Sequence, residues 1–169
     1  MIIKIKFPKN RSLKYIKDYF KNHKVLKYLS NDKHTFHPDL IDLYRIHQFI
    51  ILNKRLTVLE FGTGWSSLII QHALNLNKSK FSNESLKLKK KNQFELFVID
   101  NEKKFLNISK KRSERFFSKK KSIKKNFFYS ECFMTEFNGK FASHYKNLPL
   151  CNPDFIYVDG PSPFTVKNE

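Results

Sequence analysis

The sequence predicts a single α/β domain built on a parallel β-sheet, and three apolar segments carry this prediction. Thr57–Phe61 leads through a turn containing Gly62 and Gly64 into a helix-like run. Leu96–Ile99 and Phe155–Val158 are two further apolar runs, and each is followed by an aspartate. Continuous apolar strands separated by helical segments are typical of parallel sheets, whose strands are buried on both faces. The 169 residues fit one domain of this kind.

The composition fits a folded protein and excludes several classes. Hydrophobic residues make up 40% and aromatic residues 15% of the chain, which argues against disorder. No apolar run approaches the roughly 18 residues that a membrane span needs. The first residues, Met1 to Arg11, lack the features of a signal peptide, and two cysteines do not make a disulfide framework. We therefore expect a cytoplasmic protein.

The chain is strongly basic, with a net charge of +18. Between Lys78 and Lys125 lie 17 of the 33 Lys and Arg residues against five acids. This segment is a candidate surface for nucleic acid or for an anionic membrane. Most of the charge is lysine rather than the arginine expected for phosphate recognition, so a compositional bias with lysines on solvated helix faces is the favoured interpretation.

The N-terminal part, residues 1–35, reads as a basic helical extension. Residues 2–7 form a short strand or an extended arm, and Leu13–Leu29 shows helical periodicity. Pro38 opens a second helix that runs to about Asn53. His47 falls on its inner face, where a packed histidine is expected. His34 and His37 have the spacing of a weak metal pair, without a third ligand nearby.

The glycine turn begins with an acid, because Glu60 stands two residues before Gly62. A carboxylate at this place would repel a pyrophosphate but suits a ligand that carries an ammonium and a sulfonium. Ser67 replaces the third glycine of the dinucleotide-binding pattern. The alternative is an ordinary tight turn between a strand and a helix. Ser66 to Leu76 is the predicted helix, and the polar stretch Asn77 to Gln93 is a predicted surface loop or extra helical turn.

The second strand, Glu95 to Asp100, ends on the polar residues Asp100, Asn101 and Glu102. In α/β sites a carboxylate at this place accepts hydrogen bonds from ribose hydroxyls. We expect Asp100 to take this role, with Glu102 as second choice. The alternative role for Asp100 is to cap the following helix, Lys103 to Ser118.

The remaining segments complete the predicted sheet. Asn126 to Ser130 is a third strand followed by Glu131, and Gly139 to Leu148 is expected to be a short helix or loop. Pro153 to Pro161 is a fourth, buried strand that ends on Asp159-Gly160-Pro161. A cap after a buried strand is the alternative role for Asp159. Three of the four glycines, Gly62, Gly64 and Gly160, fall at predicted turns of one sheet edge.

Over residues 36–164 the chain resembles the class I S-adenosylmethionine (SAM) methyltransferases. Glu60-Phe61-Gly62-Thr63-Gly64 is similar to their acid-x-Gly-x-Gly motif, and Asp159-Gly160-Pro161 to the end of their fourth strand. The resemblance implies a Rossmann-like three-layer sandwich with a parallel sheet of strand order 3-2-1-4. It also implies methyl transfer to an oxygen or nitrogen of a small-molecule or sugar-like substrate.

The resemblance also implies roles for individual residues. Glu60 holds the ammonium of SAM, directly or through water, and Asp159 lines the reacting centre as a possible base. The other implied cofactor contacts are Gly62, Thr63, Gly64, Ser66, Ser67, Asp100, Asn101, Glu102 and Glu131. In some relatives an aspartate that matches Asp159 binds Mg²⁺, but the further ligands of that site are missing, so no metal is expected.

Seven strands complete the fold of this family, and strands 5–7 are missing here. Residues 36–169 therefore read as a partial SAM-methyltransferase-like domain with an open fourth strand. A truncated product, a half-domain completed by a dimer or partner chain, and a minimal fold capped by its N-terminal helices are the open explanations. A non-catalytic basic module that binds RNA through Lys78 to Lys125, or an inactive fragment, is the alternative to an enzyme.

Overall fold

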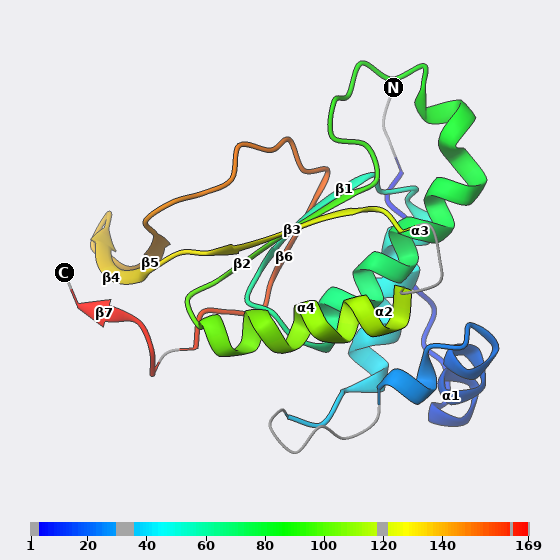
Figure 1. The fold of residues 1–169 in the computed structure, drawn as a ribbon, viewed down its shortest axis with the longest axis horizontal. Coiled ribbons are helices and arrows are strands. Elements are labelled where there is room, and N and C mark those ends of the chain that lie inside the picture. The colour runs from blue at the N-terminus through cyan, green and yellow to red at the C-terminus, as the bar shows by residue number, and fades with distance from the viewer. Residues whose placement is uncertain (1–3, 30–35, 118–121, 163, 169) are drawn as a thin grey trace.

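A computed structural model describes residues 4–29, 36–117, 122–162 and 164–168 (Figure 1). Its helices are α1 (Leu13–Asn22), α2 (Leu40–Leu52), α3 (Trp65–Ser85) and α4 (Lys103–Phe117), with a 3-10 turn η1 (Leu26–Tyr28). Its strands are β1 (Thr57–Phe61), β2 (Glu95–Asp100), β3 (Lys124–Tyr129), β4 (Cys132–Phe137), β5 (Lys140–Tyr145), β6 (Phe155–Val158) and β7 (Lys167–Asn168). The predicted α/β class is confirmed.

The main sheet has four strands in the order β3-β2-β1-β6, all parallel. Phe61 at the end of β1 lies in register with Ile99 and with Val158, so the carboxyl ends of three strands meet at one edge. At the opposite edge Asp154 accepts hydrogen bonds from the backbone N–H groups of Leu56 and Thr57, which fixes β6 beside β1.

The sheet buries its two faces in different ways. Alternate residues such as Val58, Leu96 and Val98 pack with α2, α3 and α4 in the main core. The residues between them, Leu59, Phe97 and Ile99, form a smaller cluster with Tyr145 and Cys151. The expected three-layer sandwich is therefore wrong in one layer. In the described part of the chain this second face is covered by Tyr145, at the end of β5, and by Cys151, in the loop before β6, and by no helix.

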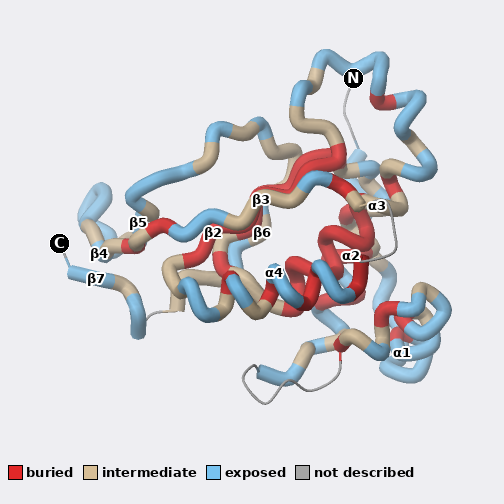
Figure 2. The backbone as a smooth tube through the Cα atoms, in the orientation of Figure 1, coloured by how far each residue is buried: buried red, intermediate tan, exposed pale blue. Residues whose placement is uncertain are grey.

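A second sheet, of order β5-β4-β7, projects from the body beyond the ends of the main strands (Figure 1). The expected helix or loop over residues 139–148 is wrong, because Lys140–Tyr145 is strand β5 paired antiparallel with β4. The turn between them is Asn138-Gly139, and both residues have positive φ, 51° and 73°. Asn-Gly with two positive φ angles is the preferred two-residue hairpin turn. The dipeptide Asn138-Gly139 is therefore the sequence signal from which the hairpin could have been predicted. Most of the hairpin is exposed (Figure 2).

Helix α3 continues to Ser85, so of the two alternatives predicted for residues 77–93, a surface loop or an extra helical turn, the helical one is right for the first half and the extension is longer than one turn. The side chains that fix this extension are polar. Asn77 is buried and donates hydrogen bonds to the carbonyls of Ile50 and Arg55, and Ser85 is buried near the helix end. A search for apolar periodicity does not detect a helix whose buried residues are asparagine and serine.

The N-terminal helix ends earlier than predicted, because the chain reverses at Lys24 (φ 58°) before η1. Helix α1 buries Ile16 and Phe20 against α2 and α3. Its Tyr19 hydroxyl shares a hydrogen bond with Nδ1 of His47, whose Nε2 lies 2.8 Å from Nδ1 of His72. His47 is thus a packed core histidine, as predicted. Among the described residues no helix is both long and apolar enough to cross a membrane.

Candidate functional site

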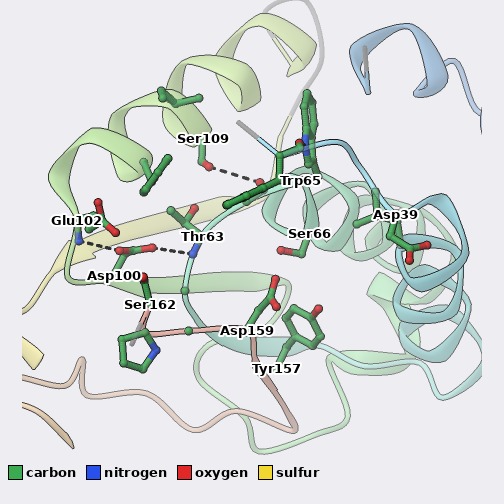
Figure 3. A pocket seen from close by; sticks show the side chains of 18 of the residues that line it. Asp39, Thr63, Trp65, Ser66, Asp100, Glu102, Ser109, Tyr157, Asp159 and Ser162 are labelled. Atoms are coloured by element: carbon green, nitrogen blue, oxygen red, sulfur yellow. Dashed lines mark hydrogen bonds between the residues drawn. The ribbon is translucent and has the colours of Figure 1, made fainter. Parts of the chain in front are cut away.

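A cleft of about 610 Å³ lies at the carboxyl edge of β1, β2 and β6, between α2 and α4 (Figure 3). Its floor is the turn from Gly62 to Ser66, which joins β1 to α3. Its volume lies in the range of small-molecule and cofactor sites. In parallel α/β sheets this edge is where ligands bind, because strand ends and helix starts converge there.

The charge of the cleft is opposite to that of the chain as a whole. Five of the chain's 15 acidic residues line it, whereas the net charge of the protein is +18. The five are Asp39, Asp42, Asp100, Glu102 and Asp159. Arg112 and His37 are the basic side chains among the lining residues. Carboxylates concentrated in a partly enclosed space attract a cationic ligand and repel a polyanionic one.

Two of the glycines at this edge are explained by their contact with each other. Gly62 has φ +84°, and a Cβ on it would lie 2.8 Å from the backbone nitrogen of Gly160. A Cβ on Gly160 would lie 2.8 Å from Cα of Gly62. The turn after β1 and the exit of β6 therefore pack backbone to backbone, and any side chain would separate them.

Gly64 has no such explanation. A Cβ built there would meet Oγ of Ser66 at 3.8 Å, which is ordinary contact, and its φ of −169° suits any residue. Gly64 lines the cleft and directly precedes α3. The missing side chain leaves the backbone at the start of this helix open to a ligand.

Asp100 connects the glycine turn to the start of α4. Its Oδ2 accepts a hydrogen bond from the backbone N–H of Thr63 (2.8 Å), and its Oδ1 accepts one from the N–H of Glu102 (2.7 Å) (Figure 3). Burial raises the pKa of the Asp100 carboxyl, and these two hydrogen bonds act in the opposite direction. Asp100 thus connects the turn after β1 to the residue before α4, and it also lines the cleft. Because Glu102 precedes the first helical residue, Lys103, this contact is not the helix cap that the alternative prediction named.

Glu60 lies beneath the cleft and does not line it. Its side chain is fully buried and accepts hydrogen bonds from the hydroxyls of Ser66 (2.5 Å) and Ser67 (2.7 Å). Burial raises the pKa of Glu60 to about 8, with smaller contributions from Asp159 and Asp100. At neutral pH the group is therefore mostly protonated, and it holds the first turn of α3 against β1.

Asp159 stands at the end of β6 with its carboxylate turned toward the cleft (Figure 3). It is more exposed than Asp100. Partial burial raises the pKa of Asp159, and the neighbouring carboxylate of Asp42 raises it further. Tyr157, two residues earlier on the same strand, faces the same space. This end of the cleft combines an accessible carboxylate with a phenol ring.

Four of the predicted site residues lie outside the cleft lining. Glu60 and Ser67 are buried beneath it, and Asn101 donates a hydrogen bond to the carbonyl of Thr165. Glu131 follows β3 and pairs with Lys146 and Lys167. The other predicted residues line the cleft: Gly62, Thr63, Gly64, Ser66, Asp100, Glu102 and Asp159.

The walls of the cleft on either side of the glycine turn are formed by helices α2 and α4, and none of the residues that these helices contribute was predicted as a site residue from the sequence. From α2 and its N-cap come Asp42 and Asp39, and from α4 come Ser109 and Arg112. The Arg112 guanidinium lies over the ring of Trp65, 3.5 Å from its centroid. A capping aspartate after Pro38 was recognisable, but the sequence does not say which site that helix start faces.

No metal centre is apparent among the described residues, where no group of three or more His, Cys, Asp or Glu side chains could hold an ion. Of the weak pair His34 and His37, the first lies outside the described residues. Both cysteines are free thiols, and burial raises the pKa of each. A thiol of this kind is a poor nucleophile at neutral pH.

Comparison with protein-family models, with curated proteins and with solved structures finds nothing that matches this chain.

Proposed function

We propose that this chain binds S-adenosylmethionine in the cleft and forms the cofactor-binding part of a class I-like methyltransferase. The observation that carries the proposal is the reversal of charge between the cleft, with its five carboxylates, and the protein, with its net charge of +18. SAM brings a sulfonium and an ammonium, which suit such a lining. The pyrophosphate of a dinucleotide would be repelled by it.

The fit of the cofactor rests on Gly64. The fold leaves room for a side chain there, so the glycine is explained by a ligand that lies against the backbone. The N–H groups at the start of α3 suit the carboxylate of the methionine part. Arg112, on the opposite wall, adds a positive charge for the same group.

The two acidic residues at and just after the end of β2, Asp100 and Glu102, have different roles toward the ribose. Both oxygens of Asp100 already accept backbone hydrogen bonds, so this residue sets the shape of the turn. Glu102 lines the cleft, and no hydrogen bond to its carboxylate is present among the described residues. We assign the ribose hydroxyls to Glu102, with Asp100 as the group that positions it.

When bound, SAM would supply its sulfonium methyl group: an acceptor oxygen or nitrogen bonds to the methyl carbon as the carbon–sulfur bond breaks, and S-adenosylhomocysteine leaves. We assign to Asp159 the proton that the acceptor loses, and the support is that its carboxylate is accessible and faces the cleft. The raised pKa of Asp159 makes it a stronger base than an aspartate whose pKa is unshifted. Asp42 and Tyr157 bound the space where the acceptor binds.

Isothermal titration calorimetry with S-adenosylhomocysteine tests the proposal. We expect a sub-millimolar Kd for the wild type and binding about tenfold weaker for Gly64→Ala, equivalent to about 1.4 kcal/mol. The thermal midpoint of Gly64→Ala should stay near that of the wild type, because the new Cβ meets only a side-chain oxygen at 3.8 Å. NAD, titrated in parallel, should bind much more weakly.

Gly139→Ala is the matched control, since Gly139 lies in the hairpin turn and has nothing within 4 Å of a built Cβ. It should leave the affinity for S-adenosylhomocysteine unchanged. Folded wild-type protein that gives no binding signal up to about 1 mM ligand, or that binds NAD as tightly, would contradict the proposal.

A further inference from the structure

The β4–β5 hairpin has two faces of different character, and the side of each residue follows from the strand register. Cys132 and Tyr145 are directly paired and point toward the main sheet, where Tyr145 packs on Phe61. Residues one step along each strand point the other way. We call this second side the outer face; it comprises Phe133, Thr135 and Phe137 of β4, Lys140, Ala142 and His144 of β5, and Lys167 of β7.

The outer face is rich in flat rings. Phe133 and His144 are cross-strand partners whose rings stack with centroids 5.7 Å apart and planes 26° apart. The ammonium of Lys167 lies 5.8 Å from the centroid of Phe133. Phe137, next to the turn, is 68% exposed and is paired in register with Lys140.

The same face carries positive charge. Lys140 is exposed, and the one carboxylate within the hairpin strands, Glu136, falls on the opposite face. Glu131, at the start of the hairpin, forms ion pairs with both Lys146 and Lys167, so these three side chains together keep a net charge of +1. The occupant that complements such a face is therefore an anion that also offers planar, apolar groups.

We propose that the outer face binds single-stranded nucleic acid, with bases stacked on Phe133, His144 and Phe137 and with phosphates near Lys140 and Lys167. Aromatic rings on a sheet face, flanked by lysines, are the general means of holding single strands without reading their sequence. From Phe133 to Phe137 the strand spans roughly 13 Å, about the length of four stacked nucleotides.

The distribution of the rings favours a nucleic acid over a membrane. A hairpin that inserts into a bilayer uses the aromatic residues at its tip on both faces, here Phe137 and Phe141. The stacked pair Phe133 and His144 instead lies nearer the base of the ribbon, in a position where bases can stack and a bilayer contact at the tip would not reach. The inference places nucleic acid on the hairpin rather than on Lys78 to Lys125, and it does not depend on SAM binding.

Fluorescence anisotropy with a labelled 12-nucleotide oligouridylate, at 50 to 200 mM NaCl, tests this assignment. The affinity should fall with salt. Phe137→Ala should weaken binding about tenfold with little change in the salt slope, because it removes a stacking surface. Lys140→Ala should reduce the slope by about 0.7, the value for one phosphate contact on a single strand.

Phe141→Ala is the matched control. Phe141 is 86% exposed on the same hairpin but belongs to the opposite face, so its removal should change the affinity less than twofold. Three results would overturn the proposal. They are no binding at 50 mM NaCl, equal losses for Phe137→Ala and Phe141→Ala, and a loss produced only by alanines at Lys89, Lys90 and Lys91. Binding to phosphatidylserine vesicles that needs both phenylalanines would assign the hairpin to membranes instead.

The two proposals fail separately. Calorimetry with S-adenosylhomocysteine on Phe137→Ala should match the wild type, because Phe137 does not line the cleft. A hairpin variant that has lost the oligonucleotide but keeps the nucleoside ligand is folded, and its phenotype then reports on the outer face.

Discussion

Replacing Glu60 by glutamine should make the protein more stable at neutral pH, although it removes a carboxylate from the glycine motif. The Glu60 side chain is fully buried against the hydroxyls of Ser66 and Ser67, and burial raises its pKa to about 8. In the unfolded chain the same group titrates near 4.5. Between these two values the unfolded state releases a proton that the folded state retains.

The sign and size of the effect follow from this difference. Because the pKa of Glu60 is higher in the folded than in the unfolded protein, the protonated side chain contributes to the unfolding free energy. This contribution is fully present below pH 4.5 and is lost as the pH rises toward 8. The loss amounts to about 1.4 kcal/mol per pH unit, or about 3 kcal/mol between pH 5 and pH 7. Glutamine has the shape of the protonated acid and cannot ionise, so Glu60→Gln should escape this loss.

Urea unfolding followed by the fluorescence of Trp65, the single tryptophan, measures the effect at pH 5, 6, 7 and 8. The quantity to compare is the unfolding free energy of Glu60→Gln minus that of the wild type, since groups common to both largely cancel. This difference should grow by about 3 kcal/mol from pH 5 to pH 7. A difference that stays constant, or shrinks, over this range would refute the buried, protonated state of Glu60.

Glu131→Gln is the control for the same measurement. The hydrogen bond from Lys167 lowers the pKa of Glu131, so this carboxylate is ionised in the folded state, and it is largely ionised in the unfolded state, over the pH range tested. The free-energy difference for Glu131→Gln should therefore be flat between pH 5 and pH 8.

Two further predictions concern the packing around the site. Gly62→Ala should lower the unfolding free energy by at least about 2 kcal/mol, because the residue has φ +84° and its Cβ would meet the backbone of Gly160. The control Gly139→Ala has φ +73° but open space around its Cβ, so it should lower the unfolding free energy by only about 1 kcal/mol. Equal losses for the two variants in urea unfolding would contradict the backbone contact. Burial, with smaller contributions from His72 and His23, lowers the pKa of His47 well below its usual value. Its contribution to stability is therefore present above pH 6.5 and is lost as the pH falls. Between pH 6.5 and 5.5 the wild type should lose more unfolding free energy than His47→Gln, and equal losses would contradict a neutral buried histidine.

The strands of the main sheet were predictable because their signal is local. In Leu96–Ile99 and Phe155–Val158 every residue is apolar, and a parallel strand covered on both faces needs that pattern. The turn after β1 was recognisable for the same reason, since glycines are rare in this chain. The hairpin was missed because its two strands carry mixed polar and apolar residues, and only Asn138-Gly139 marked the turn.

The sequence alone therefore determined the order of the core segments and the identity of the acids at their ends. Only the tertiary structure decided which of these acids line the cleft. Glu60 and Asp100 are neighbours of the same turn, but one is enclosed by two serines and the other lines the cleft. Exposure depends on what packs above a strand end, here α2 and α4, and these contacts join residues far apart in the chain. Local sequence patterns predict that a carboxylate lies at the end of a strand. The packing of helices that are distant in sequence determines whether that carboxylate is buried or lines the cleft.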